Sequence, residues 1–201
     1  MNPHSETTIA YYDRNAAQFC ARTLAVDMGE FYEPFLSGIP AGGRILDAGC
    51  GSGRDSRAFL QKGYEVVSID ASPAMVDATT QLTGQQAKLL NFEAIDFREE
   101  FDGIWACASL LHIARENLGS VLDRLAAALK PGGVLYLSFK YGEGERVEDG
   151  RYFNDLNESL FESTLALHSQ LEIRKIWTTE ETRIGRRQRW INGIARRRLN
   201  D

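Results

Sequence analysis

Residues 45–53 are Ile-Leu-Asp-Ala-Gly-Cys-Gly-Ser-Gly, an apolar run that ends in an acid and then three alternating glycines. The apolar run predicts a buried strand, and the glycines predict a tight loop after it. Because glycine has no side chain, a ligand can approach the backbone N–H groups of such a loop, which we expect to be free. Ser52 with Asp55 three residues later predicts a capped helix over residues 54–62, which Gly63 ends.

The acids around this loop distinguish it from a dinucleotide site. The dinucleotide pattern is Gly-x-Gly-x-x-Gly and favours a pyrophosphate, whereas here the spacing is Gly-x-Gly-x-Gly with Asp47 in front. A carboxylate at this place repels phosphate and suits a ligand with a cationic amino group. Residues 64–70 predict a second strand that ends in Asp70, whose carboxylate can accept both hydroxyls of a ribose. The alternative is that the glycines serve only a packed turn between strand and helix.

Acid-x-Gly-x-Gly-x-Gly, with a second acid ending the next strand, resembles the pattern of class I S-adenosylmethionine-dependent methyltransferases. Residues 101–112 resemble the fourth strand of that family and the loop beyond it, and Leu-Lys-Pro-Gly-Gly at 129–133 resembles the turn before its fifth strand. The local pattern is most similar to the tellurite-resistance-type members. The resemblance implies a Rossmann-like α/β fold with a doubly wound seven-stranded sheet. This sheet is mostly parallel, and its antiparallel last strand lies between the fifth and the sixth.

The resemblance also implies S-adenosylmethionine as cofactor, with S-adenosylhomocysteine as product. Asp70 is then the ribose ligand, and Asn91 is the expected contact of the adenine amino group. The roles of Tyr12 and Met75 stay open between cofactor contact and core packing. The full set of expected cofactor-binding residues is Tyr12, Asp47, Gly49, Cys50, Gly51, Arg54, Asp70, Ala71, Met75, Asn91, Phe92 and Cys107.

The remaining pattern predicts one methyltransferase domain over residues 1–201, with an N-terminal helical lid (1–40) and a core (41–201). Ser72-Pro73 is typical of a helix start, and this helix should run to about Leu82. Further helices are expected over 8–28, 30–36, 114–129 and 155–170, and further strands over 87–92, 134–140, 171–178 and 190–195.

The acceptor site is expected beyond the fifth strand, because open α/β sheets bind ligands at the carboxyl ends of their strands. Residues 141–153 are charged and glycine-rich, and they predict an irregular loop at this place. Lys140, Arg146, Arg151 and Tyr152 are the predicted acceptor contacts, since arginine can clamp an anion through two parallel hydrogen bonds. The alternative is that the arginines pair with acids of the same loop.

His112 is the only histidine near the cofactor end of the sheet, and it is the predicted catalytic base. A purely structural histidine is the alternative at this position. Methyl transfer from a sulfonium needs alignment and exclusion of water more than a catalytic triad.

The resemblance implies methyl transfer to a small molecule, possible classes being an anion or a metalloid oxyanion. One alternative is a transfer-RNA methyltransferase of the wobble-uridine type, because residues 171–201 hold nine Arg or Lys against four acids. The net charge of −5 counts against nucleic acid, and the basic segment fits a solubilising role equally well. A second alternative is a cofactor-binding protein without activity. The fourth strand lacks a following Asn/Asp-Pro-Pro-Tyr/Phe, which argues against methylation of exocyclic base nitrogens in DNA.

Composition sets the remaining expectations. The chain is 43% apolar, and it contains neither a membrane-spanning apolar run nor a secretory signal. Its three cysteines have no paired spacing, which argues against disulfides and a zinc site. We therefore expect a cytoplasmic protein without metal or membrane partner, as a monomer or homodimer.

Overall fold

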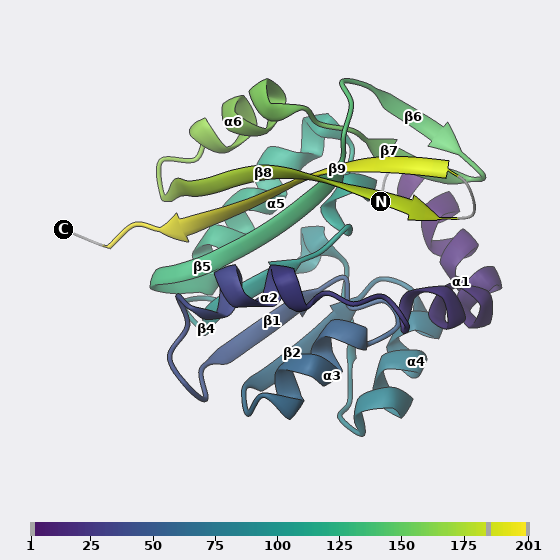
Figure 1. Cartoon of the computed structure of the whole chain (residues 1–201), viewed down its shortest axis with the longest axis horizontal. Coiled ribbons are helices and arrows are strands. Elements are labelled where there is room, and N and C mark those ends of the chain that lie inside the picture. Colours follow the sequence, from purple (N-terminus) through teal and green to yellow (C-terminus); the bar gives the residue numbers. More distant parts are fainter. Residues whose placement is uncertain (1–2, 184–185, 200–201) are drawn as a thin grey trace.

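The computed structural model describes residues 3–183 and 186–199. They form a seven-stranded sheet of order β3-β2-β1-β4-β5-β9-β8 with helices around it (Figure 1). Strand β9 runs antiparallel to both β5 and β8, while β1 to β5 pair in parallel. The predicted α/β sheet with its antiparallel last strand is therefore confirmed. The strands are β1 Arg44–Ala48, β2 Glu65–Asp70, β3 Lys88–Leu89, β4 Phe101–Ala106, β5 Leu129–Lys140, β8 Leu171–Arg183 and β9 Arg186–Arg197.

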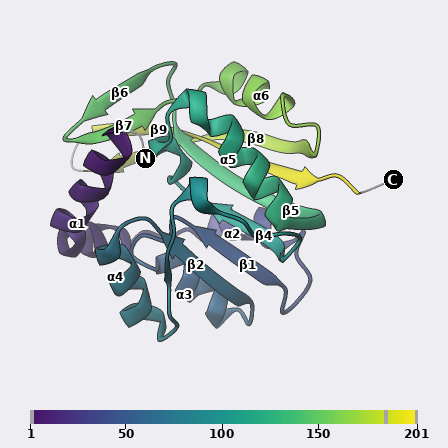
Figure 2. The ribbon, with the colours of Figure 1, turned by 180° about the vertical axis from the view of Figure 1, so that it is seen from behind.

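Helices cover both faces of this sheet (Figures 1 and 2). Helices α2 and α3 pack on one face, where Phe35 and Phe59 meet Trp105 of β4. Helices α5 and α6 cover the other face and bury the larger apolar cluster there. Helix α1 lies at the carboxyl ends of the strands and contacts α4. The helices are α1 Pro3–Thr23, α2 Gly29–Leu36, α3 Arg54–Gln61, α4 Pro73–Thr83, α5 Arg115–Ala128 and α6 Glu158–Ala166.

Local signals account for the ends of the helices next to the glycine loop. Ser72 caps α4 by accepting a hydrogen bond from the N–H of Met75 at 3.2 Å, and Pro73 occupies the first turn as predicted. Gly63 has φ +86° and follows α3 as expected. The predicted cap at Ser52 is wrong: Gly53 precedes α3 with φ +78°, and no side chain caps this helix. The Ser52 hydroxyl instead accepts a hydrogen bond from Thr23 of α1 at 3.0 Å.

Residues 141–153, predicted to be irregular, contain most of a β-hairpin. Strands β6 (Glu145–Glu148) and β7 (Arg151–Asn154) pair antiparallel, with Glu148 opposite Arg151. Between them Asp149 and Gly150 have φ of +53° and +78°, as a type I′ turn requires. The hairpin lies beside the N-terminal half of α1 (Figure 1), and the Tyr152 N–H of β7 donates a hydrogen bond to Thr8 Oγ1 of α1 at 3.0 Å.

Other expected elements also differ in extent: α1 covers residues 3–23 instead of 8–28, α6 is shorter than 155–170, and β8 and β9 are longer than 171–178 and 190–195. The third strand is only Lys88–Leu89, because Asn91 caps a short 3₁₀ turn (η1, Phe92–Ala94) where the strand was expected to end. The turn at residues 129–133 forms the irregular start of β5, with a register shift against β4. No helix in residues 3–183 and 186–199 is long and apolar enough to cross a membrane.

Candidate functional site

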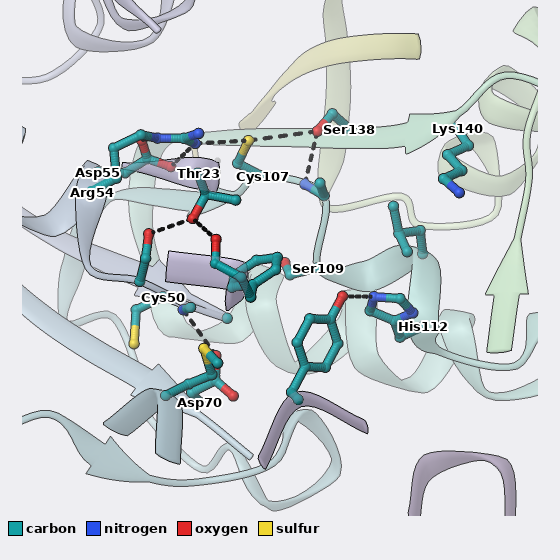
Figure 3. Close-up of a pocket in the computed structure, with 18 of the residues that line it drawn as sticks. Thr23, Cys50, Arg54, Asp55, Asp70, Cys107, Ser109, His112, Ser138 and Lys140 are labelled. Atoms are coloured by element: carbon teal, nitrogen blue, oxygen red, sulfur yellow. Dashed lines mark hydrogen bonds and ion pairs between the residues drawn. The ribbon is translucent and has the colours of Figure 1, made fainter. Parts of the chain in front are cut away.

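A cavity of about 500 Å³ lies at the carboxyl ends of β1, β2, β4 and β5 (Figure 3). Helix α1 closes one side of it, and the β6–β7 hairpin and β9 contribute to the other side. Eleven of the expected cofactor-binding residues line it, namely Tyr12, Gly49, Cys50, Gly51, Arg54, Asp70, Ala71, Met75, Asn91, Phe92 and Cys107. Of the four predicted acceptor contacts, Lys140 and Arg151 line the cavity.

The glycine loop forms one end of this cavity, but its backbone donors are engaged within the protein. The N–H groups of Gly49 and Cys50 both donate to the carbonyl of Ile69 at 2.9 Å, and Gly51 donates to Asp70. The expectation of free N–H groups is therefore wrong at these three positions, because the loop wraps around the end of β2. What the loop offers a ligand is its shape.

Each glycine of the loop has its own steric reason. A Cβ at Gly49 would come within 2.4 Å of Ser109, and one at Gly53 within 2.9 Å of the Thr79 backbone. Gly53 does not line the cavity and serves the close packing of α3 on α4. Gly51 does line the cavity. An added Cβ at this position would meet only the Phe19 ring, at 3.3 Å, and would stand between the glycine loop and helix α1.

Asp70 ends β2 with its carboxylate at the cavity wall. Its Oδ2 accepts the Gly51 N–H and its Oδ1 accepts the Ser72 N–H, both at 2.9 Å. Burial is the largest cause that raises the pKa of Asp70, while these backbone hydrogen bonds act to lower it. Each carboxylate oxygen keeps a further lone pair, so that the pair can accept two adjacent hydroxyls.

Met75, Asn91 and Phe92 continue the same wall. Met75 is almost completely buried in the first turn of α4. Asn91 accepts the N–H of Ala94 through Oδ1 at 2.9 Å, and the second lone pair of this oxygen suits an amino group. A flat heterocycle at this place would lie between apolar side chains and meet one amide at its edge.

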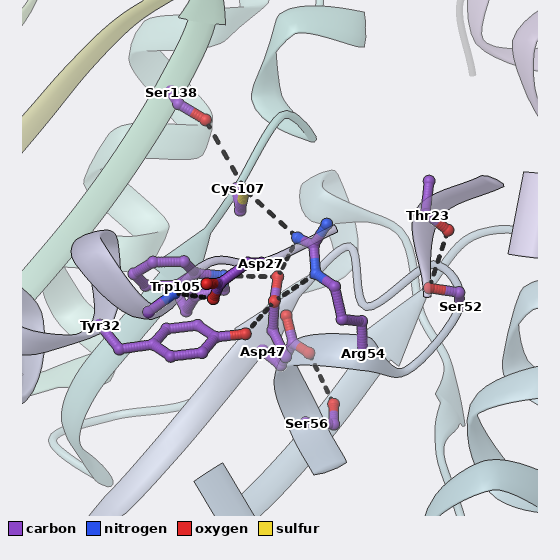
Figure 4. A network of polar contacts seen from close by, with 12 residues as sticks. Thr23, Asp27, Tyr32, Asp47, Ser52, Arg54, Ser56, Trp105, Cys107 and Ser138 are labelled. Atoms are coloured by element: carbon purple, nitrogen blue, oxygen red, sulfur yellow. Dashed lines mark hydrogen bonds and ion pairs between the residues drawn. The ribbon is translucent and has the colours of Figure 1, made fainter. Parts of the chain in front are cut away.

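Asp47, predicted to face the ligand, is buried behind the loop and is not part of the cavity wall. The Ser56 hydroxyl donates to its Oδ2 at 2.5 Å (Figure 4). Burial raises the pKa of Asp47 to about 7, and the negative charge of Asp55 is the second cause.

Asp55 takes the position at the wall that sequence reasoning gave to Asp47. It accepts hydrogen bonds from the Tyr32 hydroxyl at 2.6 Å and from Trp105 Nε1 at 2.9 Å. Arg54 forms a bidentate ion pair with it at 2.7 and 2.8 Å and points along the wall toward Cys107 (Figure 4). The sequence predicted a cofactor contact for Arg54, whereas Asp55 was predicted only as part of the helix start.

His112 and Tyr12 meet across the cavity, although 100 positions separate them in the sequence. The Tyr12 hydroxyl and His112 Nε2 are 2.7 Å apart, and Nδ1 lies 2.6 Å from the carbonyl oxygen of Tyr152. Burial lowers the pKa of His112 to about 4, and the charges of Arg151 and Lys140 lower it further. The imidazole is therefore neutral at pH 7.

The acceptor end contains a cluster of cations around the ring of Phe153. Lys140 Nζ lies 3.8 Å from the ring centroid, and the Arg151 guanidinium lies 5.1 Å from it. Burial and the charge of Arg146 lower the pKa of Lys140. Arg151 Nε is buried, and no group among the described residues accepts a hydrogen bond from it.

Arg146 and Tyr152 were predicted here but do not line the cavity. Arg146 pairs with Glu148 at 3.1 Å, as the alternative interpretation of the loop expected, and also with Asp155 at 3.0 Å. Arg151 likewise lies 3.8 Å from Asp149 of the same loop. Tyr152 alternates with Arg151 along β7, so its side chain points to the other face of the hairpin and its hydroxyl contacts Glu145.

Further residues that line the cavity were not predicted from the sequence. Tyr136 on β5 stacks on Trp105 at 3.9 Å and donates to Asn192 of β9 at 2.8 Å. Other residues of this part of the wall are Asp27, Glu30, Phe31, Ser138, Thr179, Glu180, Glu181 and Trp190.

These residues fit S-adenosylmethionine. Asp70 stands where two ribose hydroxyls can be accepted, Asn91 and Phe92 follow it along the wall, and the glycine at position 51 leaves the space that a Cβ would fill. Arg54 and Asp55 present opposite charges beyond the loop, which suits a zwitterionic amino-acid group. Within the described ranges, no three His, Cys, Asp or Glu side chains could together hold a metal ion.

Known proteins resemble this chain in sequence and in fold. Residues 45–133 match the family model described as "Methyltransferase domain". The ubiquinone biosynthesis O-methyltransferase of Nitrobacter winogradskyi is 38% identical over 104 residues, which is 49% of this chain and 39% of that protein. The chain thus matches only about two fifths of that relative's length.

Solved structures resemble nearly the whole chain at low identity. The 1,6-didemethyltoxoflavin-N1-methyltransferase of Burkholderia thailandensis, solved with S-adenosylhomocysteine, has a TM-score of 0.78 at 21% identity and covers 98% of this chain and 91% of its own. The [4+2]-cyclase SpnF has a TM-score of 0.74 at 16% identity, with coverage of 98% and 97%. The fold alone therefore does not determine the reaction. The domain match over residues 45–133, the sheet order and the residues that line the cavity together support a class I S-adenosylmethionine-dependent methyltransferase.

Proposed function

We propose that this protein transfers the methyl group of S-adenosylmethionine to a hydroxyl of a small, flat acceptor that carries an anionic group. The observation that carries the proposal is the continuity of one cavity from Asp70 at the cofactor end to Lys140 and Arg151 at the other end. When bound, S-adenosylmethionine supplies an activated methyl on a positively charged sulfur. The protein has to hold the acceptor in line with it and exclude water.

The anionic group is inferred from the cation cluster. Arg151 has a buried Nε without a partner among the described residues, while its Nη2 lies 3.8 Å from Asp149. Only 14% of the Lys140 side chain is exposed, and its Nζ pairs with Glu148 at 3.5 Å. An unpaired buried donor is costly, so an acceptor carboxylate that satisfied Arg151 Nε beside Lys140 would be favoured. The aromatic part of the wall, with Tyr136, Phe153 and Trp190, supports a flat acceptor.

The hydroxyl nucleophile is inferred from the relative. The sequence match to an O-methyltransferase reaches 38% identity, but it includes only part of that protein and supports the class of reaction rather than one substrate. The wobble-uridine alternative receives no support from the cavity wall. Asp27, Glu30, Glu180 and Glu181 contribute to this wall, and they would repel a phosphate backbone.

The test compares two probe acceptors that differ by one charge, 3,4-dihydroxybenzoate and catechol. We expect both to be methylated, with a lower KM for the carboxylate, as measured by release of S-adenosylhomocysteine and mass of the product. Methylation of neither probe, together with methylation of bulk transfer RNA, would favour the RNA alternative. S-adenosylhomocysteine binding without turnover of any acceptor would favour the inactive cofactor-binding protein.

Replacement of Arg151 by alanine should raise the KM for 3,4-dihydroxybenzoate by roughly 10- to 100-fold, because a charged hydrogen bond of about 1.5–3 kcal/mol is lost. The KM for catechol and the affinity for S-adenosylhomocysteine should hardly change. Arg146→Ala is the matched control, since this arginine lies on the same hairpin and outside the cavity wall. Equal effects of the two substitutions would contradict the assignment of Arg151.

A further inference from the structure

Both ring nitrogens of His112 have hydrogen-bond partners, and one of these partners, a carbonyl oxygen, has a fixed polarity. The carbonyl of Tyr152 can only accept, so Nδ1 carries the proton and donates to it across 2.6 Å. Nε2 is then the acceptor, and the Tyr12 hydroxyl donates to it across 2.7 Å. For this nitrogen to accept a proton directly from an acceptor molecule, the Tyr12 hydroxyl would first have to leave.

The surroundings keep the ring in this neutral form. The Tyr12 and Phe153 rings lie 5.4 and 5.0 Å from the imidazole. Burial and two nearby cations, Arg151 and Lys140, hold the pKa of His112 near 4. Burial raises the pKa of Tyr12 to about 12. Neither group is suited to take a proton from a phenol near neutral pH.

Tyr12 belongs to helix α1, which is fastened on both sides of this contact. Toward its N-terminus, Thr8 Oγ1 accepts the backbone N–H of Tyr152 at 3.0 Å. Next to Tyr12, the carboxylate of Asp13 accepts from the Ser72 hydroxyl at 2.5 Å, two residues beyond Asp70. The helix thus joins the acceptor hairpin to the ribose end of the cavity, with Tyr12 between them. Figure 3 shows His112 on the side of Lys140, away from Asp70 and Cys50.

We propose that His112 is a positioning residue that acts through Tyr12, and that the Tyr12 hydroxyl is the group that contacts the acceptor. The hydroxyl donates to Nε2 and also interacts with the Arg151 guanidinium, and it keeps a lone pair for a hydrogen bond from the acceptor, which orients the nucleophile. No proton passes to His112: as the O–CH3 bond forms and the S–CH3 bond breaks, the reacting hydroxyl releases its proton to solvent. This role replaces the general base expected from sequence, and it rests on the proposed function for its acceptor.

The test uses two substitutions of His112, which distinguish a role as hydrogen-bond acceptor for Tyr12 from a role as catalytic base. In His112→Gln the side-chain oxygen can accept the Tyr12 hydrogen bond but has no basicity, whereas His112→Leu has neither property. We expect kcat with 3,4-dihydroxybenzoate to stay within about 3-fold in His112→Gln and to fall by roughly 10- to 100-fold in His112→Leu, as for a misplaced contact. Equal loss in both variants would overturn the proposal and restore the base.

Tyr12→Phe provides a second, independent test, because it removes the hydroxyl and keeps the aromatic ring. Because His112 acts through the lost hydroxyl, His112→Leu should reduce kcat no further in the Tyr12→Phe background. Additive losses would overturn the proposal. This arm also remains informative if the leucine variant alone folds poorly.

Amide hydrogen exchange of residues 3–23 in the S-adenosylhomocysteine complex needs no acceptor. Exchange should be faster in His112→Leu and Tyr12→Phe and near the wild-type rate in His112→Gln. Unchanged exchange in all three would overturn the positioning role. If 3,4-dihydroxybenzoate is not methylated at all, the proposed function fails, and the exchange experiment alone decides whether His112 holds helix α1 through Tyr12.

Discussion

Two carboxylates lie at the carboxyl ends of the neighbouring strands β1 and β2, and their surroundings give them different tasks. Asp70 receives two backbone N–H groups and keeps lone pairs toward the cavity. Asp47, near the end of β1, receives the Ser56 hydroxyl from the first turn of α3, and that contact turns it away from the cavity. Sequence alone placed both acids at the correct edge of the sheet. It could not tell them apart, because the difference lies in which donors the loop presents to each.

Asp70→Ala should weaken S-adenosylhomocysteine binding by roughly 10- to 100-fold without unfolding the chain. The physical reason is the loss of a charged acceptor for the ribose, worth about 1.5–3 kcal/mol. Calorimetry measures the affinity, and circular dichroism checks the fold. Asp77→Ala on the exposed side of α4 is the matched control. A folded Asp70 variant with unchanged affinity would move the ribose contact to another residue.

Asp47 should make stability depend on pH. Burial raises its native pKa to about 7, whereas the unfolded value is about 3.9. The native state therefore binds more protons between these values. Its contribution to the free energy of unfolding is present below about pH 4 and is lost as the pH rises through 7.

Asp47→Asn should thus lose less stability between pH 5 and pH 8 than the wild type, because the amide stays neutral and still offers Ser56 an acceptor. Urea unfolding at the two pH values measures the difference. Asp96→Asn, at an exposed position, should leave the wild-type slope unchanged. The same slope in Asp47→Asn as in wild type would show that Asp47 is ionised at pH 5.

At the scale of elements, local signals predicted the central β-α units and missed the hairpin. The capping serine, the proline after it and the apolar strands act over a few residues, and they were enough for β1, β2 and α4, whereas β4 was expected from the family resemblance. Asp149-Gly150 is also a local signal, typical of a type I′ hairpin, but the surrounding glycines and charges obscured it. The pairing of Tyr12 with His112 joins segments 100 positions apart, which no local pattern encodes.

Gly150→Ala tests the hairpin turn. The residue has φ +78°, and a Cβ would meet no atom within 4 Å, so backbone strain is the only cost, about 1–2 kcal/mol. We expect a loss of this size in urea unfolding and a higher KM for 3,4-dihydroxybenzoate, because the turn sets the position of Arg151. Gly144→Ala is the matched control, since it also has open space around it and no positive φ. Equal stability of the two variants would contradict the turn geometry.

At the scale of the whole molecule, the cavity joins parts of the chain that are distant in sequence. Helix α1, the strand ends from β1 to β5, the β6–β7 hairpin and β9 all contribute to one wall. A ligand that contacts all of them is bound by the native state and not by the unfolded chain. Its binding free energy therefore adds to the stability of the whole fold.

S-adenosylhomocysteine at 100 times its Kd should accordingly stabilise the protein by about 2.7 kcal/mol. For a chain of this length that corresponds to a rise in Tm of roughly 5–11 °C. Scanning calorimetry measures the shift, and adenine at the same concentration is the control, because it lacks the ribose that Asp70 accepts. In Asp70→Ala the rise should be smaller at the same concentration, since fewer molecules hold ligand. A Tm that does not respond to millimolar S-adenosylhomocysteine would contradict the assignment of this cavity to the cofactor.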